Sequence, residues 1–347
     1  RLGMSTSLVF VGGALSALAV LLGYGIAAVA LSVVVTTVLS GLMYLYIVRT
    51  QVPWFGIARP SVAAVRRFIG LSWWFLVWNF VMQMMRGADV IVLGIAGSAG
   101  IVTAYTLTRY IPDAITIAVA TVIFAVMPGL GGLVGAGDMK RSVQVRDETM
   151  AVTWGLATAS GVAVLVWERP FLDLWVGSRY YPGTTAVVLI VVMVLQLALI
   201  RTDSNIIDVT LRLQAKTLLG LASAVLSAAL GWYLLSVRDL GISGLVAGFV
   251  LGRVMLSVAY PWLVGRMLGI AVRRQVVGAV RPGLVTCALL VTGTAVGTVV
   301  QTGSWLVLTA GAAATTAAAV AVAFGVGLPR GLRRQVVART RQAAAFR

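Results

Sequence analysis

The stretch YTLTRYIPD (residues 105–113) runs directly into AITIAVATVIFAVMPG (114–129), which contains no charged residue. An uncharged run of about 18 or more residues is long enough to cross the hydrocarbon core of a bilayer as a helix. The apolar run that contains these residues reaches this length, and similar runs recur along the chain. The sequence therefore predicts several membrane spans, one of which carries Arg109 and Asp113 four residues apart.

The composition agrees with this prediction. The chain is 60% hydrophobic and 11% charged, against about 25% charged residues in a soluble domain. Backbone groups in lipid must be hydrogen-bonded within a helix or a closed barrel, and the alternating ten-residue segments of a barrel are not seen. We therefore predict an all-α polytopic membrane protein.

The rare residue types exclude several kinds of chemistry. There is no histidine and a single cysteine, Cys287, inside an apolar run. A disulfide within the chain, a Cys/His zinc site and any mechanism that needs histidine are therefore excluded. The sequence predicts no metal and no cofactor, and nothing in it resembles an enzyme site.

Ten segments are predicted to be transmembrane helices, and Gly, Pro or charged residues separate them. Their approximate limits are 6–22, 27–48, 69–88, 100–127, 149–167, 183–202, 215–236, 242–265, 280–300 and 304–327.

Basic residues predict the orientation of these spans. Of the 27 Lys and Arg residues, 21 fall on one side, four on the other, and Arg109 and Arg253 inside spans. Loops rich in Lys and Arg stay in the cytoplasm, so both ends of the chain are expected there. The net charge of +17 is thereby explained without a nucleic-acid partner.

Small residues predict close helix packing. Gly244, Gly248 and Gly252 recur every four residues in GISGLVAGFVLG (241–252). Such spacing gives a helix a groove that the backbone of a neighbouring helix can approach.

Ionisable residues inside spans are costly and usually face a bundle interior or a water-filled cavity. Arg109 and Asp113 share a helical face, and Pro112 between them frees the carbonyl of Thr108 and favours a kink. The pair is either a structural ion pair or part of a site. Arg253 has no acid within four residues, so its partner is on another helix or is an anionic ligand. The other candidates are Arg86 and Asp89, and the group Arg201, Asp203 and Asp208.

A membrane-bound glycan ligase or polymerase is a possible alternative. The longest predicted outer loop, 168–182, contains Glu168 and Asp173, and paired carboxylates can serve acid and base chemistry. So short a loop disfavours an enzyme.

Four stretches, in this order, resemble the polysaccharide-flippase branch of the MATE/MOP exporter superfamily, the Wzx-like transporters of O-antigen and exopolysaccharide. They are GADVIVLGIAGSAGIVTAYTLTRYIPD (87–113), AVMPGLGGLVGAGDMKR (125–141), FLDLWVGSRYYPG (171–183) and LGISGLVAGFVLGR (240–253). The resemblance covers about residues 60–270.

This resemblance implies a MOP-type two-lobe helical bundle of 14 helices, ten of which are visible. Residues 1–48 would be the last two helices of the N-lobe, whose first four helices are missing, and 49–68 a cytoplasmic linker. The six-helix C-lobe would span 69–268, two additional helices 280–327 and a basic cytoplasmic tail 328–347.

The resemblance also implies that a lipid-linked oligosaccharide, anchored to a polyprenyl diphosphate, is flipped across the bacterial cytoplasmic membrane by alternating access. Membrane lipids and a coupling ion, H⁺ or Na⁺, would be the other partners. The expected anion-binding residues are Arg109, Arg253 and Arg86. The residues expected to couple or gate ions are Asp113, Asp89 and Asp208, and protonation of Asp113 would release Arg109 for substrate. A MATE-type drug or cation antiporter and a lipid II flippase are the alternatives on this fold.

Overall fold

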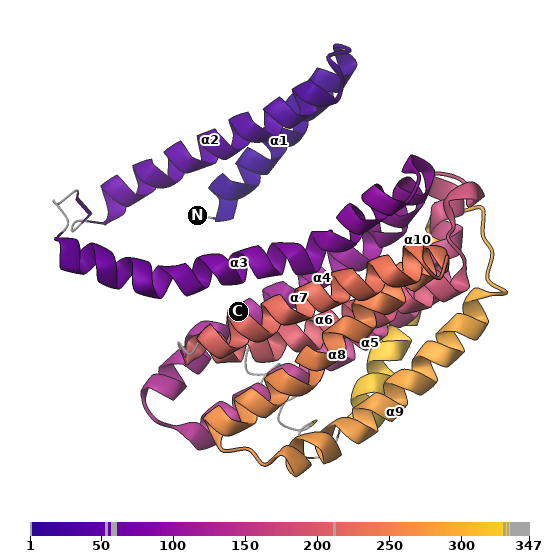
Figure 1. Cartoon of the computed structure of the whole chain (residues 1–347). Coiled ribbons are helices and arrows are strands. Elements are labelled where there is room, and N and C mark those ends of the chain that lie inside the picture. Colours follow the sequence, from indigo (N-terminus) through magenta and orange to yellow (C-terminus); the bar gives the residue numbers. More distant parts are fainter. Residues whose placement is uncertain are drawn as a thin grey trace. The chain divides into compact units, whose positions relative to one another are not determined.

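The computed structural model describes residues 2–52, 55–56, 61–210, 213–328, 331 and 333. In these residues every regular element is a helix and no strand occurs (Figure 1). Nine of the described helices are long and apolar enough to cross a membrane. The chain is thus an all-helical, multi-pass membrane protein, as its composition predicts.

Each of the ten predicted spans corresponds to one helix. The helices are α1 (Leu2–Leu21), α2 (Gly25–Gln51), α3 (Val62–Ala96), α4 (Ala99–Gly135), α5 (Met139–Trp175), α6 (Thr184–Val209), α7 (Leu213–Ser236), α8 (Gly241–Leu268), α9 (Val272–Gly297) and α10 (Trp305–Val322). A 3₁₀ turn, η1 (Ser178–Tyr180), precedes α6, and a π-helical segment, η2 (Ala323–Gly327), follows α10. The helices α2 to α10 are the nine candidate spans, and α1 contributes a shorter apolar stretch, Phe10–Leu21.

Several helices are longer than the predicted spans. The helix α5 begins at Met139, where Asp138 caps it by accepting a hydrogen bond from the amide of Arg141 at 3.1 Å. It then continues to Trp175, so the predicted outer loop 168–182 is wrong for residues 168–175. Polar residues end an apolar run, but a helix can continue through them because its backbone bonds are independent of hydropathy.

The chain forms two compact units, Arg1–Phe68 and Ile69–Arg347. In the first unit, α1 and α2 form a hairpin in which the hydroxyl groups of Ser16 and Ser32 lie 2.6 Å apart.

The predicted linker 49–68 is partly helical, because α2 extends to Gln51 and α3 begins at Val62. Of the predicted tail 328–347, only Leu328, Gly331 and Arg333 are among the described residues.

In the second unit, α5 and α6 are the most buried helices. The helix α5 packs against α4, α6, α9 and α10, whereas α8 packs against α6 and α7. Large apolar side chains such as Val258, Val291 and Leu306 remain exposed on the outer helices. An exposed surface of this kind suits a protein whose surroundings are lipid.

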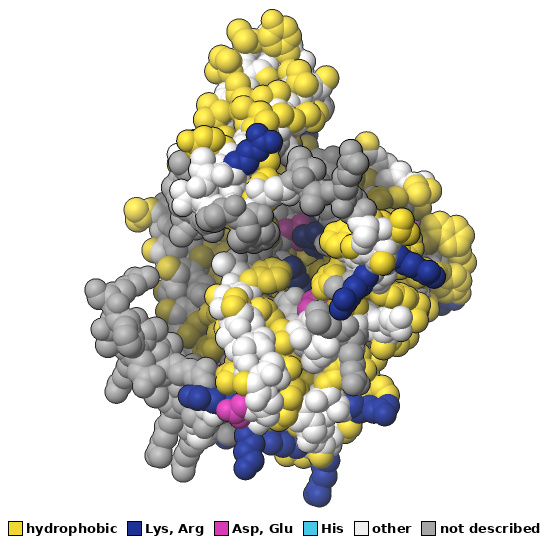
Figure 2. Space-filling model, turned by 90° about the vertical axis from the view of Figure 1, so that its left-hand side faces the viewer, with side chains coloured by type: hydrophobic (Ala, Val, Ile, Leu, Met, Phe, Trp, Pro, Cys, Tyr) yellow, Lys and Arg dark blue, Asp and Glu magenta, His cyan; other side chains and the backbone are white. Residues whose placement is uncertain are grey.

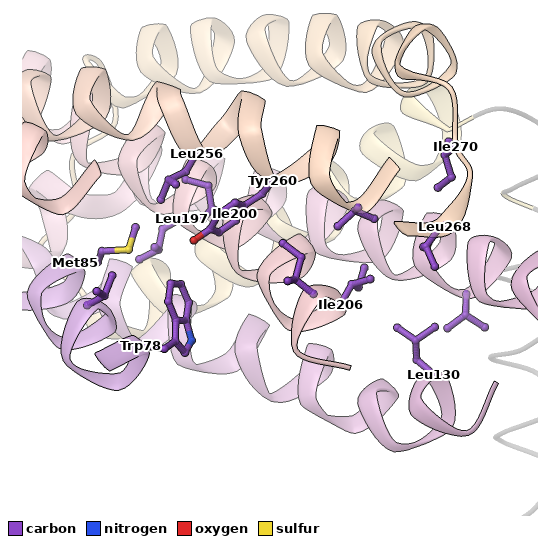
Figure 3. Packing of buried hydrophobic residues seen from close by; sticks show 14 residues of the cluster. Trp78, Met85, Leu130, Leu197, Ile200, Ile206, Leu256, Tyr260, Leu268 and Ile270 are labelled. Atoms are coloured by element: carbon purple, nitrogen blue, oxygen red, sulfur yellow. The ribbon is translucent and has the colours of Figure 1, made fainter. Parts of the chain in front are cut away.

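A buried hydrophobic cluster joins α3 to α6 and α8 (Figure 3). Trp78 and Met85 of α3 contribute to it, together with Ile200 of α6 and Leu256 and Tyr260 of α8. Trp78 and Tyr260 lie with their ring centroids 6.4 Å apart. The cluster fixes α3 beside α8. The turn of α3 that follows Met85, with Arg86 and Asp89, therefore lies close to Arg253 of α8.

The glycine stripe of α8 lies against α7. A Cβ atom at Gly252 would stand 2.5 Å from the backbone of Ser227, and one at Gly244 would stand 2.8 Å from the carbonyl oxygen of Leu234. Gly248 is in equally close contact with the backbone of Gly231. The two helices therefore approach as closely as their backbones allow.

Candidate functional site

Arg109 makes ion pairs with two aspartates. Its Nη1 atom bonds to Asp89 Oδ2 of α3, and its Nη2 atom lies 3.0 Å from Asp113 Oδ1, one turn further along α4. The Asp89 side chain is 1% exposed, whereas that of Asp113 is 50% exposed. The sequence predicts the pair within α4, but the more deeply buried partner is on another helix.

Further hydrogen bonds hold the Asp89 carboxylate. The hydroxyl of Tyr105 donates to Oδ2 at 2.7 Å, and the amide of Val90 donates to Oδ1 at 2.8 Å. Arg109 Nη2 also donates to the carbonyl of Arg86 at 3.2 Å. Asp89 is therefore fully engaged with α3 and α4, as a buried charge must be.

Arg253 is placed differently. It is one of the largest fully buried side chains, 2% exposed, and its Nη2 atom donates to the carbonyl of Met85 on α3. Its Nε and Nη1 atoms are buried, and no described residue accepts a hydrogen bond from them. It is also within electrostatic range of Asp89, Tyr105 and Arg109. A buried guanidinium normally has its donors satisfied, so the two donors of Arg253 call for an acceptor that these contacts do not supply.

Two more arginines lie near this group. Arg86 of α3 is exposed, with Nη2 2.5 Å from Gln83 Oε1, and it is within electrostatic range of Arg201 of α6. We call Arg86, Arg109, Arg201, Arg253, Asp89 and Asp113 the charged cluster. Its four arginines outnumber its two aspartates, which favours an anionic ligand. Figure 2 shows basic and acidic side chains among the hydrophobic ones on one face.

The depth of the cluster follows from helix geometry. At 1.5 Å per residue, Arg109 lies about 15 Å from the start of α4 at Ala99, and Arg253 about 18 Å from the start of α8 at Gly241. Both side chains are therefore well inside their helices.

The second partner of Arg109 also weakens the expectation that protonation of Asp113 releases Arg109 for substrate. Protonation of Asp113 alone would leave Arg109 paired with Asp89.

Asp208 belongs to a second buried group, which the sequence does not reveal. Its Oδ1 atom lies 2.5 Å from Lys216 Nζ, and Lys216 is 0% exposed. The ammonium group is 3.7 Å from the centroid of the Trp78 ring, and the hydroxyl of Tyr260 donates to the carbonyl of Lys216. Lys216 stands at the very start of the predicted span 215–236 and is counted with the cytoplasmic basic residues, but in the structure it is an internal cation near the start of α7.

Arg146 and Asp203 form a third buried pair, between α5 and α6. Arg146 Nη2 lies 2.9 Å from Asp203 Oδ1 and 3.2 Å from Gln275 Oε1 of α9. Asp147 pairs with the exposed Arg274 of α9 at 3.1 Å. These bonds connect three helices at one end of the unit, so Asp203 has a structural role as a partner of Arg146.

The two carboxylates considered for an enzyme point in different directions from α5. Glu168 is 2% exposed inside α5, and its Oε1 atom has no hydrogen-bond partner. Asp173 is exposed and lies five residues further along the same helix, which turns it about 140° from Glu168. Among the described residues, no group of three or more His, Cys, Asp or Glu side chains could hold a metal ion.

No family model, no curated protein and no solved structure matches this chain. The resemblance to polysaccharide flippases therefore depends on the sequence motifs alone. The fold and the site define a multi-pass helical membrane protein whose second unit has a charged cluster rich in arginine.

Proposed function

We propose that this protein is a flippase that moves a lipid-linked oligosaccharide, anchored to a polyprenyl diphosphate, across the bacterial cytoplasmic membrane. The proposal joins the sequence resemblance to one structural observation. That observation is Arg253, a buried cation with two unpaired donor atoms that lies within electrostatic range of Arg109. The proposed orientation places both ends of the chain in the cytoplasm.

A diphosphate is the ligand that best suits this charge pattern. Arginine presents several N–H donors in a planar fork that matches phosphate oxygens. Charge-assisted hydrogen bonds are strong where water is excluded, and Arg253 is excluded from water. The diphosphate would thus supply acceptors for the free Nε and Nη1 atoms, while Arg86 and Arg201 add positive potential.

The charge balance argues against a drug or cation antiporter. A site for a cationic substrate needs an excess of acidic side chains, because like charges in a low dielectric repel strongly. The two aspartates of the charged cluster are already paired with Arg109. A lipid II flippase would need the same diphosphate chemistry, and only the attached glycan distinguishes it from the proposed substrate.

Binding of undecaprenyl diphosphate to the purified full chain tests the proposal. We expect Arg253→Met to weaken binding by about 10- to 100-fold, because the variant loses one or two charge-assisted hydrogen bonds to the diphosphate. Methionine keeps much of the side-chain volume and removes the buried charge, so the variant should fold. Undecaprenol, which lacks phosphate, should bind with equal affinity to both proteins.

Arg266→Met is the matched control. Arg266 is on the same helix, but it is exposed and stacks on Trp262 at 5.0 Å, so its loss should leave binding unchanged. In cells, depletion of the protein should cause lipid-linked oligosaccharide to accumulate, and Arg253→Met should not correct this accumulation. Normal export in the depleted cells would rule out the proposed function.

A further inference from the structure

Glu168 is a buried acid that the charged cluster does not use. It is on the stripe of α5 that also contains Val164, Leu165 and Leu172, three or four residues away. Val164 and Leu165 belong to a hydrophobic cluster with side chains of α4 and α6. Glu168 therefore faces an apolar region between these helices, and its Oε1 atom has no partner there.

Among the described residues, no charge neutralises this carboxyl group. Burial acts on Glu168 without an opposing charge on α4, α6, α9, α10 or η1 in the described part of the chain. The hydrophobic cluster beside Val164 and Leu165 also contains Val187, and Ile111, Ile115 and Tyr181 pack against it. The guanidinium of the adjacent Arg169 is directed at the Tyr181 ring, 5.8 Å from its centroid. An ionised carboxylate in such surroundings is very costly, so the neutral acid is the stable form.

The surroundings also distinguish a proton from a metal cation. Cations such as Ca²⁺ take six or more oxygen ligands, and the side chains of the hydrophobic cluster beside Glu168 offer a single hydroxyl, that of Tyr181. A proton needs only one carboxylate oxygen. Glu168 is therefore suited to bind H⁺ and unsuited to bind Na⁺, which would also need several oxygens.

The aqueous phase is close to Glu168. The residue lies seven positions before the end of α5, or about 10 Å along the helix. Between it and that end is an aromatic layer in which Trp175 contacts Phe171 and Tyr110, and Phe171 contacts Trp305. Only this layer and the last turns of α5 separate the carboxyl from the end of the helix, so a small separation of α4 or α6 from α5 would bring water to it.

We propose that Glu168 is the proton-binding site that couples transport to the proton gradient. In the present conformation the carboxylic acid holds the proton. When α4 or α6 separates from α5, the acid releases H⁺ to water and becomes a carboxylate, and the return to the packed state requires that a proton be taken up again. The coupling part of this proposal rests on the proposed function, and the proton site does not.

Infrared spectroscopy of the purified full chain tests the proton site directly. We expect a carbonyl band of a protonated carboxylic acid that is lost in Glu168→Gln and retained in Asp173→Asn, whose acid is exposed on the same helix. Glutamine has nearly the same shape and no charge, so the variant should keep the thermal stability of the wild type. A spectrum in which Glu168→Gln leaves the band unchanged would overturn the proposal, whatever the substrate is.

Export of the lipid-linked oligosaccharide at different external pH values tests the coupling. Wild-type export should vary with pH, Glu168→Gln should lose this dependence together with most of the transport, and Glu168→Asp should keep the dependence. Wild-type export in Glu168→Gln with unchanged pH dependence would disprove the coupling role. If depletion of the protein has no effect on export, the proposed function fails, but the infrared result still decides the proton site.

Discussion

At the residue scale, burial decides which ion pair matters. Arg109 has two acidic partners, but Asp89 is buried and holds three hydrogen bonds, whereas half of the Asp113 side chain is exposed. An ion pair that is open to solvent contributes little to stability, because water screens the two charges and can hydrogen-bond to each of them. A buried pair is costly to break, because one charge is then left without a partner.

These differences predict unequal effects of two similar substitutions. We expect Asp89→Asn to destabilise the protein by about 3 to 5 kcal/mol, since Arg109 loses its buried partner. Asp113→Asn should cost less than about 1 kcal/mol. Thermal unfolding in detergent measures both. Equal destabilisation by the two variants would show that the exposed pair is as important as the buried one.

At the element scale, small residues control how α7 and α8 pack. The stripe Gly244, Gly248 and Gly252 is directly against the backbone of α7 around Ser227 and Gly231. In lipid there is little hydrophobic force between helices, so close van der Waals contact supplies much of their association. A single methyl group at this contact would separate the helices.

The prediction is that Gly248→Ala lowers stability by about 1 to 3 kcal/mol through overpacking. Gly278→Ala is the matched control, because Gly278 is also inside a helix, α9, and no heavy atom lies within 4 Å of its Cβ position. The control should be neutral or about 0.5 to 1 kcal/mol more stable, since alanine favours the helix. Comparison of the two unfolding temperatures separates packing from helix propensity, and an equal effect would refute the packing argument.

At the scale of the whole molecule, the distribution of basic residues predicts the orientation. The short loop at Gly97–Ser98 between α3 and α4 is expected outside, whereas the turn at Ala136–Asp138 between α4 and α5 is expected in the cytoplasm. Both Ser98 and Ala136 are exposed. The single native cysteine, Cys287, makes a simple labelling experiment possible.

In a Cys287→Ser background, Ser98→Cys should react with a membrane-impermeant maleimide added to intact cells. Ala136→Cys should react only after the cells are permeabilised. Labelling is measured by the mass increase of the purified chain. The reverse pattern would place both ends of the chain outside the cytoplasm and would contradict the orientation.

The sequence by itself determined the helices, because an apolar run of sufficient length must form a helix in lipid whatever surrounds it. It also determined local pairs such as Arg109 with Asp113, since four residues make one helical turn. Only the tertiary structure decided that Asp89 is the buried partner of Arg109, and that Lys216 is internal beside Asp208 and Trp78. It also decided that Glu168 Oε1 has no hydrogen-bond partner among the described residues. These facts depend on which helices lie side by side, and neither composition nor periodicity encodes the contacts between helices that are far apart in the chain.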